Sequence, residues 1–129
     1  MSIKELATLA NTSEETKKFQ KELNSGTASL VLLSVLDKAP QPMYGYQIAK
    51  LIDANAGEIP IMKQGTLYPV LRSLESSGLL ESEVEPSVSG PPRRYYRITE
   101  AGRKTLKKWC EIWKQNKTFV DNVLEGVER

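Results

Sequence analysis

The chain has 129 residues, of which 40% are hydrophobic and 26% charged, and its formal net charge is +2. This length allows one compact domain with one or two long helices, and no apolar run is long enough to span a bilayer. There is no histidine and only one cysteine, Cys110, which excludes His-based triads, His metal ligands and an intrachain disulfide. The first residues lack a signal-peptide core. We therefore expect a cytoplasmic protein that is not an enzyme and that holds no metal or cofactor.

Positive charge is concentrated in residues 61–110, which contain nine basic and five acidic residues and leave a net −2 for the remainder. A basic segment in a nearly neutral chain indicates a polyanionic partner, although a solvated basic surface gives the same pattern.

Residues 1–24 are expected to form two short helices, or one helix broken near residues 11–13. Ser2 with Glu5, and Thr12 with Glu15, match the capping box that begins many helices. Their apolar stripes, the second of which contains Phe19 and Leu23, are too narrow to fold alone. This segment must therefore pack on another part of the protein.

Two helices are expected after the Ser25-Gly26 dipeptide. Residues 27–38 are apolar nearly all round, which predicts a buried central helix that Pro40 and Pro42 end. Residues 43–55 predict a second, amphipathic helix with an inner stripe of Tyr44, Ile48, Leu51 and Ile52.

The stretch 63–78 predicts a third helix with two contrasting faces. Its apolar stripe contains Leu67, Val70, Leu71 and Leu74. The opposite face carries no acid, and it contains Thr66, Tyr68, Pro69, Arg72, Ser73 and Ser76. Hydroxyls and a guanidinium suit a helix whose N-terminal half lies in the DNA major groove. An ordinary core helix would have the same apolar stripe.

A hairpin is expected directly after this helix. The runs L-L-E-S-E-V-E (79–85) and R-R-Y-Y-R-I-T (93–99) predict two strands, and P-S-V-S-G-P-P (86–92) predicts the loop between them. The helices expected over residues 43–55 and 63–78 form a helix-turn-helix-like pair. A hairpin that follows such a pair is called a wing, and here Arg93 and Arg94 are placed to meet a phosphate backbone or minor groove. The alternative is a solvated basic hairpin.

Three segments carry a resemblance to a known family: M-Y-G-Y-Q-I (43–48), G-T-L-Y-P-V-L-R-S-L-E-S-S-G-L-L (65–80) and G-P-P-R-R-Y-Y-R-I-T-E-A-G (90–102). Over roughly residues 19–124 the chain resembles the PadR-like family of bacterial transcriptional regulators. The resemblance implies a homodimeric winged helix that usually represses transcription until an effector binds. It also implies a DNA-binding surface made by Tyr44, Lys63, Gln64, Thr66, Tyr68, Arg72, Arg93 and Arg94. Lys63 stands where family members often have a small capping residue, and residues 1–15 look like an extension beyond the family core.

The final helix, expected over residues 100–125, has an apolar edge. Leu106, Trp113, Val120 and Val127 are spaced by sevens, which predicts a heptad-like seam at a dimer interface. Packing against residues 1–24 of the same chain is the alternative, and we expect both. The predicted interface contains Phe19, Leu23, Leu106, Cys110, Val120, Val123 and Leu124.

Trp109 and Trp113 lie four residues apart on one face of this helix, beside the seam. Their rings can interdigitate as interface core or flank a slot for a flat apolar ligand. In some drug- or phenolic-binding PadR-like proteins, a tryptophan near the position of Trp113 lines such a slot. The resemblance therefore implies a planar aromatic effector.

The expected fold is mainly α with a small β-hairpin: a winged helix-turn-helix (25–99) with an N-terminal helical extension (1–24) and a C-terminal dimerisation helix (100–129). The expected function is sequence-specific binding of a palindromic DNA operator by a regulator, with recognition helices about 34 Å apart. The alternative is a winged-helix protein–protein adaptor without specific DNA binding.

Overall fold

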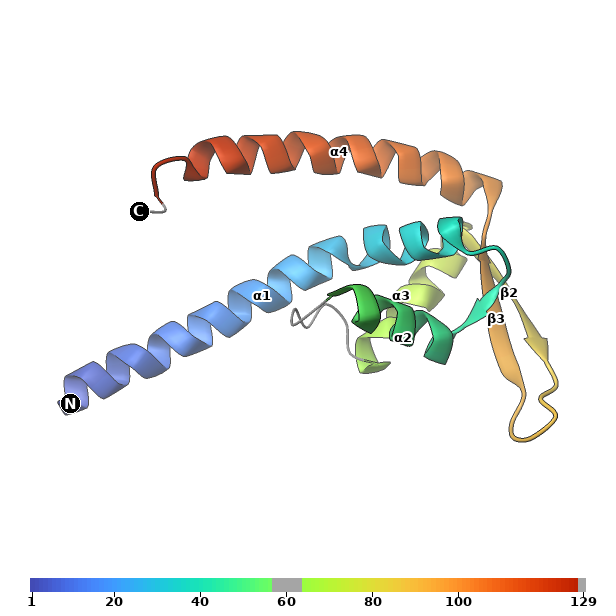
Figure 1. Ribbon diagram of the computed structural model, residues 1–129, viewed down its shortest axis with the longest axis horizontal. Coiled ribbons are helices and arrows are strands. Elements are labelled where there is room, and N and C mark those ends of the chain that lie inside the picture. The colour runs from blue at the N-terminus through green and yellow to red at the C-terminus, as the bar shows by residue number, and fades with distance from the viewer. Residues whose placement is uncertain (57–63, 128–129) are drawn as a thin grey trace.

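A computed structural model describes residues 1–56 and 64–127, with the side chains of 10–12, 56, 64 and 65 left out. The fold is mainly helical with one small antiparallel sheet, as the sequence predicted. Figure 1 shows its elements in chain order: α1 (Ile3–Lys38), β1 (Met43–Tyr44), α2 (Gly45–Ala56), α3 (Gln64–Ser76), β2 (Leu80–Glu85), β3 (Arg93–Ile98) and α4 (Glu100–Leu124).

Helix α1 is continuous, so the breaks expected near residues 11–13 and at Ser25-Gly26 are wrong. It begins with the expected capping box, in which the Glu5 amide donates to Ser2 Oγ (3.1 Å) and the Ser2 amide donates to the Glu5 carboxylate (3.4 Å). A glycine inside a helix costs only about 1 kcal/mol relative to alanine. That cost is small beside the burial of the C-terminal half of α1, so Gly26 does not end the helix.

The hydrophobic core lies under the C-terminal half of α1. Helices α2 and α3 pack below it, and the sheet and the first turns of α4 close it (Figure 1). The largest fully buried side chains are Leu32, Leu33, Ile48, Leu67, Leu71 and Leu80. Residues 27–38 are therefore central, as expected. Leu51, expected on the inner stripe of α2, is instead 41% exposed.

The sheet has three strands in the order β1-β3-β2, where two were expected. Met43 and Tyr44 were predicted to begin a helix, but they pair with Tyr96 and Tyr95 of β3. The amide of Tyr44 donates to Gln47 Oε1 (3.1 Å), which satisfies a free donor at the start of a helix. The helix consequently begins at Gly45, after the strand.

The T-E-A-G segment at the start of α4 forms a tight joint with the turn between α3 and β2. Thr99 caps α4, because its Oγ1 accepts from the Gly102 amide (3.0 Å), and the same hydroxyl donates to the Gly78 carbonyl (2.7 Å). A Cβ on Gly102 would collide with the Leu79 carbonyl oxygen. A side chain at this position would therefore force α4 away from the turn.

The two long helices diverge away from this joint, and their free ends lie apart (Figure 1). All residues from 111 to 127 are exposed, as are residues 1–9 and 13–19. The expected packing of the final helix on residues 1–24 of the same chain is therefore wrong for residues 1–9 and 13–19. No helix among the described residues is long and apolar enough to cross a membrane.

Candidate DNA-binding surface

Helix α3 has the two-faced character that its sequence predicted. Leu67, Leu71 and Leu74 are buried in the core. The outer face is exposed over the residues expected there: Thr66, Tyr68, Pro69, Arg72, Ser73 and Ser76. Its carboxylate, Glu75, is only partly exposed and accepts a hydrogen bond from Ser82 of β2. The described exposed residues of α3 thus present hydroxyls and a cation, with no acid to repel a phosphate.

Tyr68 joins α3 to the beginning of α2. A Cβ built on Gly45 would lie 2.5 Å from the Tyr68 hydroxyl and 2.8 Å from its ring, so the phenol packs directly on the glycine backbone. The side chain nevertheless remains 44% exposed. Tyr68 therefore packs α3 against the start of α2 while much of the residue stays at the surface. Pro69, expected near the start of the helix, lies in its second turn.

Arg72 extends from the same face one turn later. Its Nε lies 3.5 Å from the Tyr68 carbonyl oxygen, a long contact within the helix. The terminal amino groups of the guanidinium can donate two parallel hydrogen bonds, the geometry with which arginine reads guanine in the major groove. Lys63 lies outside the described residues, and of Gln64 only the backbone, the first residue of α3, is described.

Arg93 and Arg94, expected to act alike, point to opposite faces of the wing, because successive side chains of a strand alternate. Arg93 lies over the Tyr44 ring, with its guanidinium carbon 4.5 Å from the ring centroid. The Tyr44 ring also packs edge-on against Tyr95, at 5.4 Å between centroids. Arg94 points the other way, where its Nη1 donates to Ser82 Oγ (3.0 Å) on the side of α3.

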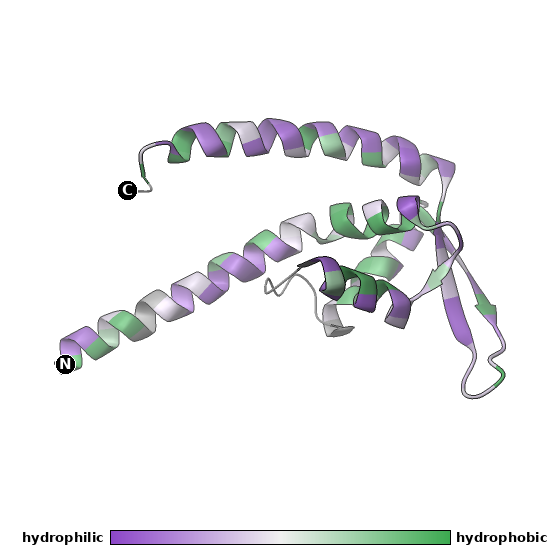
Figure 2. Cartoon of the chain, viewed as in Figure 1, coloured by the Kyte–Doolittle hydropathy of each residue, from purple (hydrophilic) through white to green (hydrophobic). Residues whose placement is uncertain are grey.

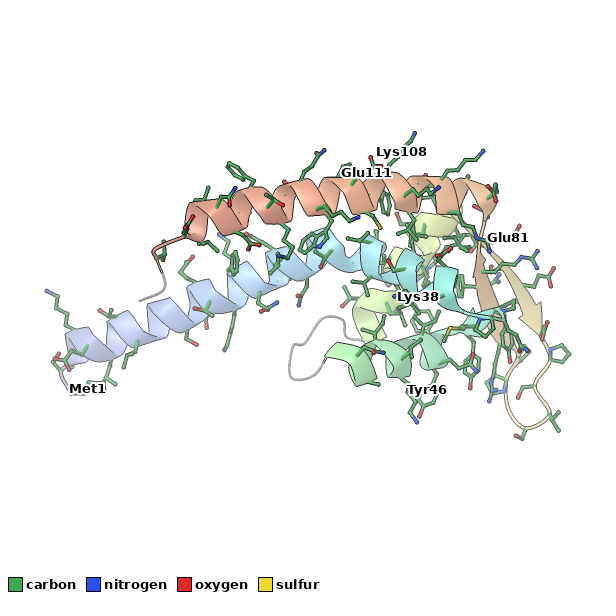
Figure 3. The ribbon with its side chains drawn as sticks, turned by 45° about the horizontal axis from the view of Figure 1, so that its top comes forward. Met1, Lys38, Tyr46, Glu81, Lys108 and Glu111 are labelled. Atoms are coloured by element: carbon green, nitrogen blue, oxygen red, sulfur yellow. The ribbon has the colours of Figure 1, made fainter. Side chains whose placement is uncertain are left out.

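The two faces of the wing also differ in charge. Glu81, Glu83 and Glu85 alternate along β2 opposite Arg97, Tyr95 and Arg93 of β3. Arg97 Nε and Glu81 Oε1 are 2.6 Å apart, so this pair neutralises itself at the surface. Figure 3 labels Glu81 on the side of the sheet away from α3. The outer face of the wing thus carries three carboxylates beside Arg93 and Arg97, whereas the described exposed face of α3 carries no acid.

Tyr96 lies beneath this surface and is buried. Burial raises the pKa of its phenol above the ordinary value of about 10, and the negative charge of Glu75 raises it further, while Arg94 and Arg72 act in the opposite direction. The phenol is therefore neutral near pH 7. The charges of Glu75, Arg94 and Arg72 all act on Tyr96, where α3 and the wing join.

The residues expected at an interface divide into two groups. Leu106 is 8% exposed and belongs to the core of the chain itself, and Trp109 and Cys110 pack partly against that core. Further along α4, the exposed apolar side chains are Ile112, Trp113, Phe119, Val120, Val123 and Leu124, and Val127 is exposed beyond the end of the helix. On α1, Phe19 and Leu23 are exposed as well. Figure 2 shows apolar bands on both helices where they diverge.

The family of this chain follows from its similarity to known proteins. Residues 32–108 match the sequence profile of the PadR-like family of transcriptional regulators. The chain belongs to the PadR-like family. PadR family regulators bind DNA, typically as dimers. The family and the structural neighbours of this chain are transcriptional regulators, not enzymes.

Individual proteins are similar to this chain over most of its length. An uncharacterised protein of Lysinibacillus sphaericus is 32% identical over 100 residues, covering 78% of this chain and 89% of that protein. The crystal structure of a PadR family regulator from Eggerthella lenta superposes with a TM-score of 0.77 at 34% identity, over 91% of this chain and 98% of that one. A regulator from Clostridium thermocellum gives 0.70 at 32% identity, over 78% and 93%.

Sequence reasoning missed two features of this surface. Ser82 was assigned no role, although its hydroxyl joins α3 to the wing; its spacing of seven residues from Glu75, across a turn, gives no signal. The separation of Arg93 from Arg94 did have a signal, because adjacent strand residues must face opposite ways. Ile112 and Phe119 were also missed, although they share one side of α4 with Val123.

Proposed function

We propose that this PadR-like protein is a dimeric regulator that binds a palindromic operator sequence-specifically and represses transcription. The observation that carries the proposal is the exposed face of α3, which has hydroxyls and a guanidinium but no carboxylate among its described residues. Arg94 lies on the α3 side of the wing. Cationic and hydroxyl donors without an acid on the α3 side, and acids paired with arginines on the outer face of the wing, favour approach of DNA from the α3 side.

The dimer is supported by the apolar surface of α4. Trp113, Val120 and Leu124 follow one side of the helix, and Ile112, Phe119 and Val123 follow an adjacent side. Two apolar sides on one helix can both be covered if the partner packs two elements against it. A second copy of the chain has two such elements, its own α4 and the exposed first half of its α1. Figure 3 shows Lys108 and Glu111 pointing away from α1, so the polar face of α4 is left for solvent.

Division of the chain into an N-terminal extension (1–24), a winged-helix domain (25–99) and a C-terminal dimerisation helix (100–129) fits this arrangement. The boundary at residue 24 then marks where α1 leaves the core, and not where a helix ends. Leu106 is left out of the proposed interface, because it is buried within the single chain.

Selection of binding sites from a random duplex library tests sequence-specific binding. The protein should enrich a two-fold symmetric sequence and bind it at least about a thousandfold more tightly than unselected duplex at moderate salt. No enrichment, with equal affinity for all duplexes, would favour the alternative, a winged-helix adaptor that binds another protein. The three glutamates on the outer face of the wing are the feature that favours that alternative.

An effector between the subunits is the second part of the proposal. Trp113 is 42% exposed on the same side of α4 as Val120 and Leu124, where a second copy would bring another Trp113 near the two-fold axis. Trp109 is partly buried against the core and so offers only part of its ring. A planar aromatic compound held there would lower DNA affinity if it prefers a dimer with a different spacing of its two α3 helices.

Tryptophan fluorescence tests this second part. Planar aromatic compounds should quench the wild-type protein saturably and weaken its binding to the selected duplex, and Trp113→Phe should reduce both effects. Saturable quenching that Trp113→Phe leaves unchanged would remove Trp113 from the effector site.

A further inference from the structure

Ser82 occupies the middle of a short chain of hydrogen bonds that links the recognition helix to the wing. Its hydroxyl donates to Glu75 Oε2 of α3 (2.5 Å) and accepts from Arg94 Nη1 of β3 (3.0 Å). Ser82 pairs with Tyr96 in the sheet, so Arg94 is its diagonal neighbour on the same face. Glu75, Ser82 and Arg94 thus form a relay across three separate elements.

Hydrogen bonds are donated in one direction along the relay, from Arg94 to Ser82 and from Ser82 to Glu75. A guanidinium can only donate and a carboxylate can only accept, whereas a hydroxyl does both. The positive end therefore lies on the wing and the negative end on α3, and each bond strengthens the next. Alanine at position 82 breaks both bonds, but threonine retains a hydroxyl that can make them.

The relay leaves Arg94 able to bind a further group. Only Nη1 is used by Ser82, and a guanidinium has five N–H donors. Arg94 is exposed and has no ion pair within the part of the chain that the structure describes, in contrast to Arg97, which is paired with Glu81. Arg93 is on the other face, over Tyr44. Arg94 is therefore the wing cation that is both free to bind an anion and held beside α3.

We propose that Glu75 and Ser82 are positioning residues, which hold the Arg94 guanidinium on the α3 side of the wing so that it meets the DNA backbone beside the recognition helix. This inference rests on the proposed DNA-binding function and specifies one part of it. Glu75 and Ser82 touch no DNA themselves. Their effect reaches DNA through Arg94.

A double-mutant cycle on a mixed-sequence duplex tests the proposal, since a phosphate contact does not depend on base sequence. Arg94→Ala should flatten the plot of log affinity against log salt concentration by about 0.9, the share of one phosphate. Ser82→Ala should weaken binding about fivefold, the size of one hydrogen bond, in the wild-type background. In the Arg94→Ala background it should have almost no effect, and Ser82→Thr should restore binding.

Ser77→Ala is the matched control, because Ser77 is an exposed serine just after α3 whose side chain lies outside the relay. It should leave both affinity and salt slope unchanged. Equal losses from Ser82→Ala in the two backgrounds, or a Ser82→Thr variant as weak as Ser82→Ala, would overturn the proposal.

Amide hydrogen exchange of the DNA-free protein separates this inference from the proposed function. If wild-type protein binds no duplex, the proposed function fails, and exchange then decides the relay alone. Ser82→Ala should speed exchange at the amides of the Glu83–Tyr95 pair beyond Ser82, while leaving those of the Glu81–Arg97 pair nearer the base of the hairpin slow. Unchanged exchange at Glu83 and Tyr95 would show that the hydroxyl does not hold the wing.

Discussion

For single residues, the ability of the α3 surface to bind DNA depends on which of its side chains already have partners within the protein. Tyr68 is packed on the Gly45 backbone, and Glu75 is hydrogen-bonded to the Ser82 hydroxyl. Arg72 has only one long contact with its own helix. Among the described residues of α3, Arg72 is therefore the side chain with the most unused hydrogen-bond donors, which makes it the strongest candidate for reading a base.

Arg72→Ala should weaken binding to the selected duplex by about 1–3 kcal/mol, the range for a bidentate contact with a base. Binding to unselected duplex should change much less, because that binding depends on phosphate contacts. Competition between the two duplexes in a fluorescence anisotropy titration measures the difference. A variant that loses equal affinity for both duplexes would show that Arg72 contacts phosphate and not a base.

Tyr96 predicts how stability depends on pH. Its pKa in the folded protein is raised, chiefly by burial, so the folded state retains a proton that the unfolded state releases above about pH 10. The free energy of unfolding should therefore fall as the pH rises through this range. Urea denaturation measures this: the free energy of unfolding of wild type minus that of Tyr96→Phe should be constant near pH 7 and should fall as the pH passes about 10. A constant difference across that range would contradict the raised pKa.

At the scale of elements, local patterns predicted α3, the wing and α4 because each has its own periodicity or turn residues. The buried leucines of α3 recur at helical spacing, and Leu106, Trp113 and Val120 of α4 are spaced by sevens. The strand at Met43 and Tyr44 was not predictable in this way, because it exists only by pairing with β3, far along the chain. The continuity of α1 across Gly26 was also missed, since a weak local signal is overridden by burial of the following turns.

The joint between α4 and the α3–β2 turn gives a test with an internal control. Gly102→Ala would place a methyl group against the Leu79 carbonyl and 2.7 Å from Ile98 Cγ1, and such overpacking costs about 1–3 kcal/mol of unfolding free energy. Gly26→Ala adds a methyl where no atom lies within 4 Å, and it should stabilise α1 by up to about 1 kcal/mol. Urea denaturation of both variants measures this, and a stabilised Gly102→Ala protein would contradict the close packing.

At the scale of the whole molecule, the single chain leaves two apolar surfaces uncovered. They lie on the first half of α1 and the second half of α4, which diverge from the core (Figure 1). Neither surface is needed to complete the winged helix, since the core residues of α4 end near Cys110. Exposed apolar surface of this extent on two helices is typical of an interface.

Val123→Asp tests the proposed dimer without disturbing the core of the chain, because Val123 is 61% exposed. The substitution should weaken the dimer by at least about 2 kcal/mol, as expected for a residue central to an interface. Sedimentation equilibrium measures the dissociation constant, which should rise at least roughly thirtyfold. Thr118→Asp, on the polar side of the same helix, is the control. Dimers of equal strength in both variants would place the interface elsewhere.

A hydroxyl-radical footprint of the protein on its selected duplex tests the central claim, that two copies present their α3 helices to one DNA site. Two protected half-sites related by two-fold symmetry are expected, with centres about 34 Å apart, one turn of the duplex. Arg72→Ala should also weaken protection equally in both halves. A single unsymmetrical protected segment, or protection that does not depend on the sequence of the duplex, would contradict this claim.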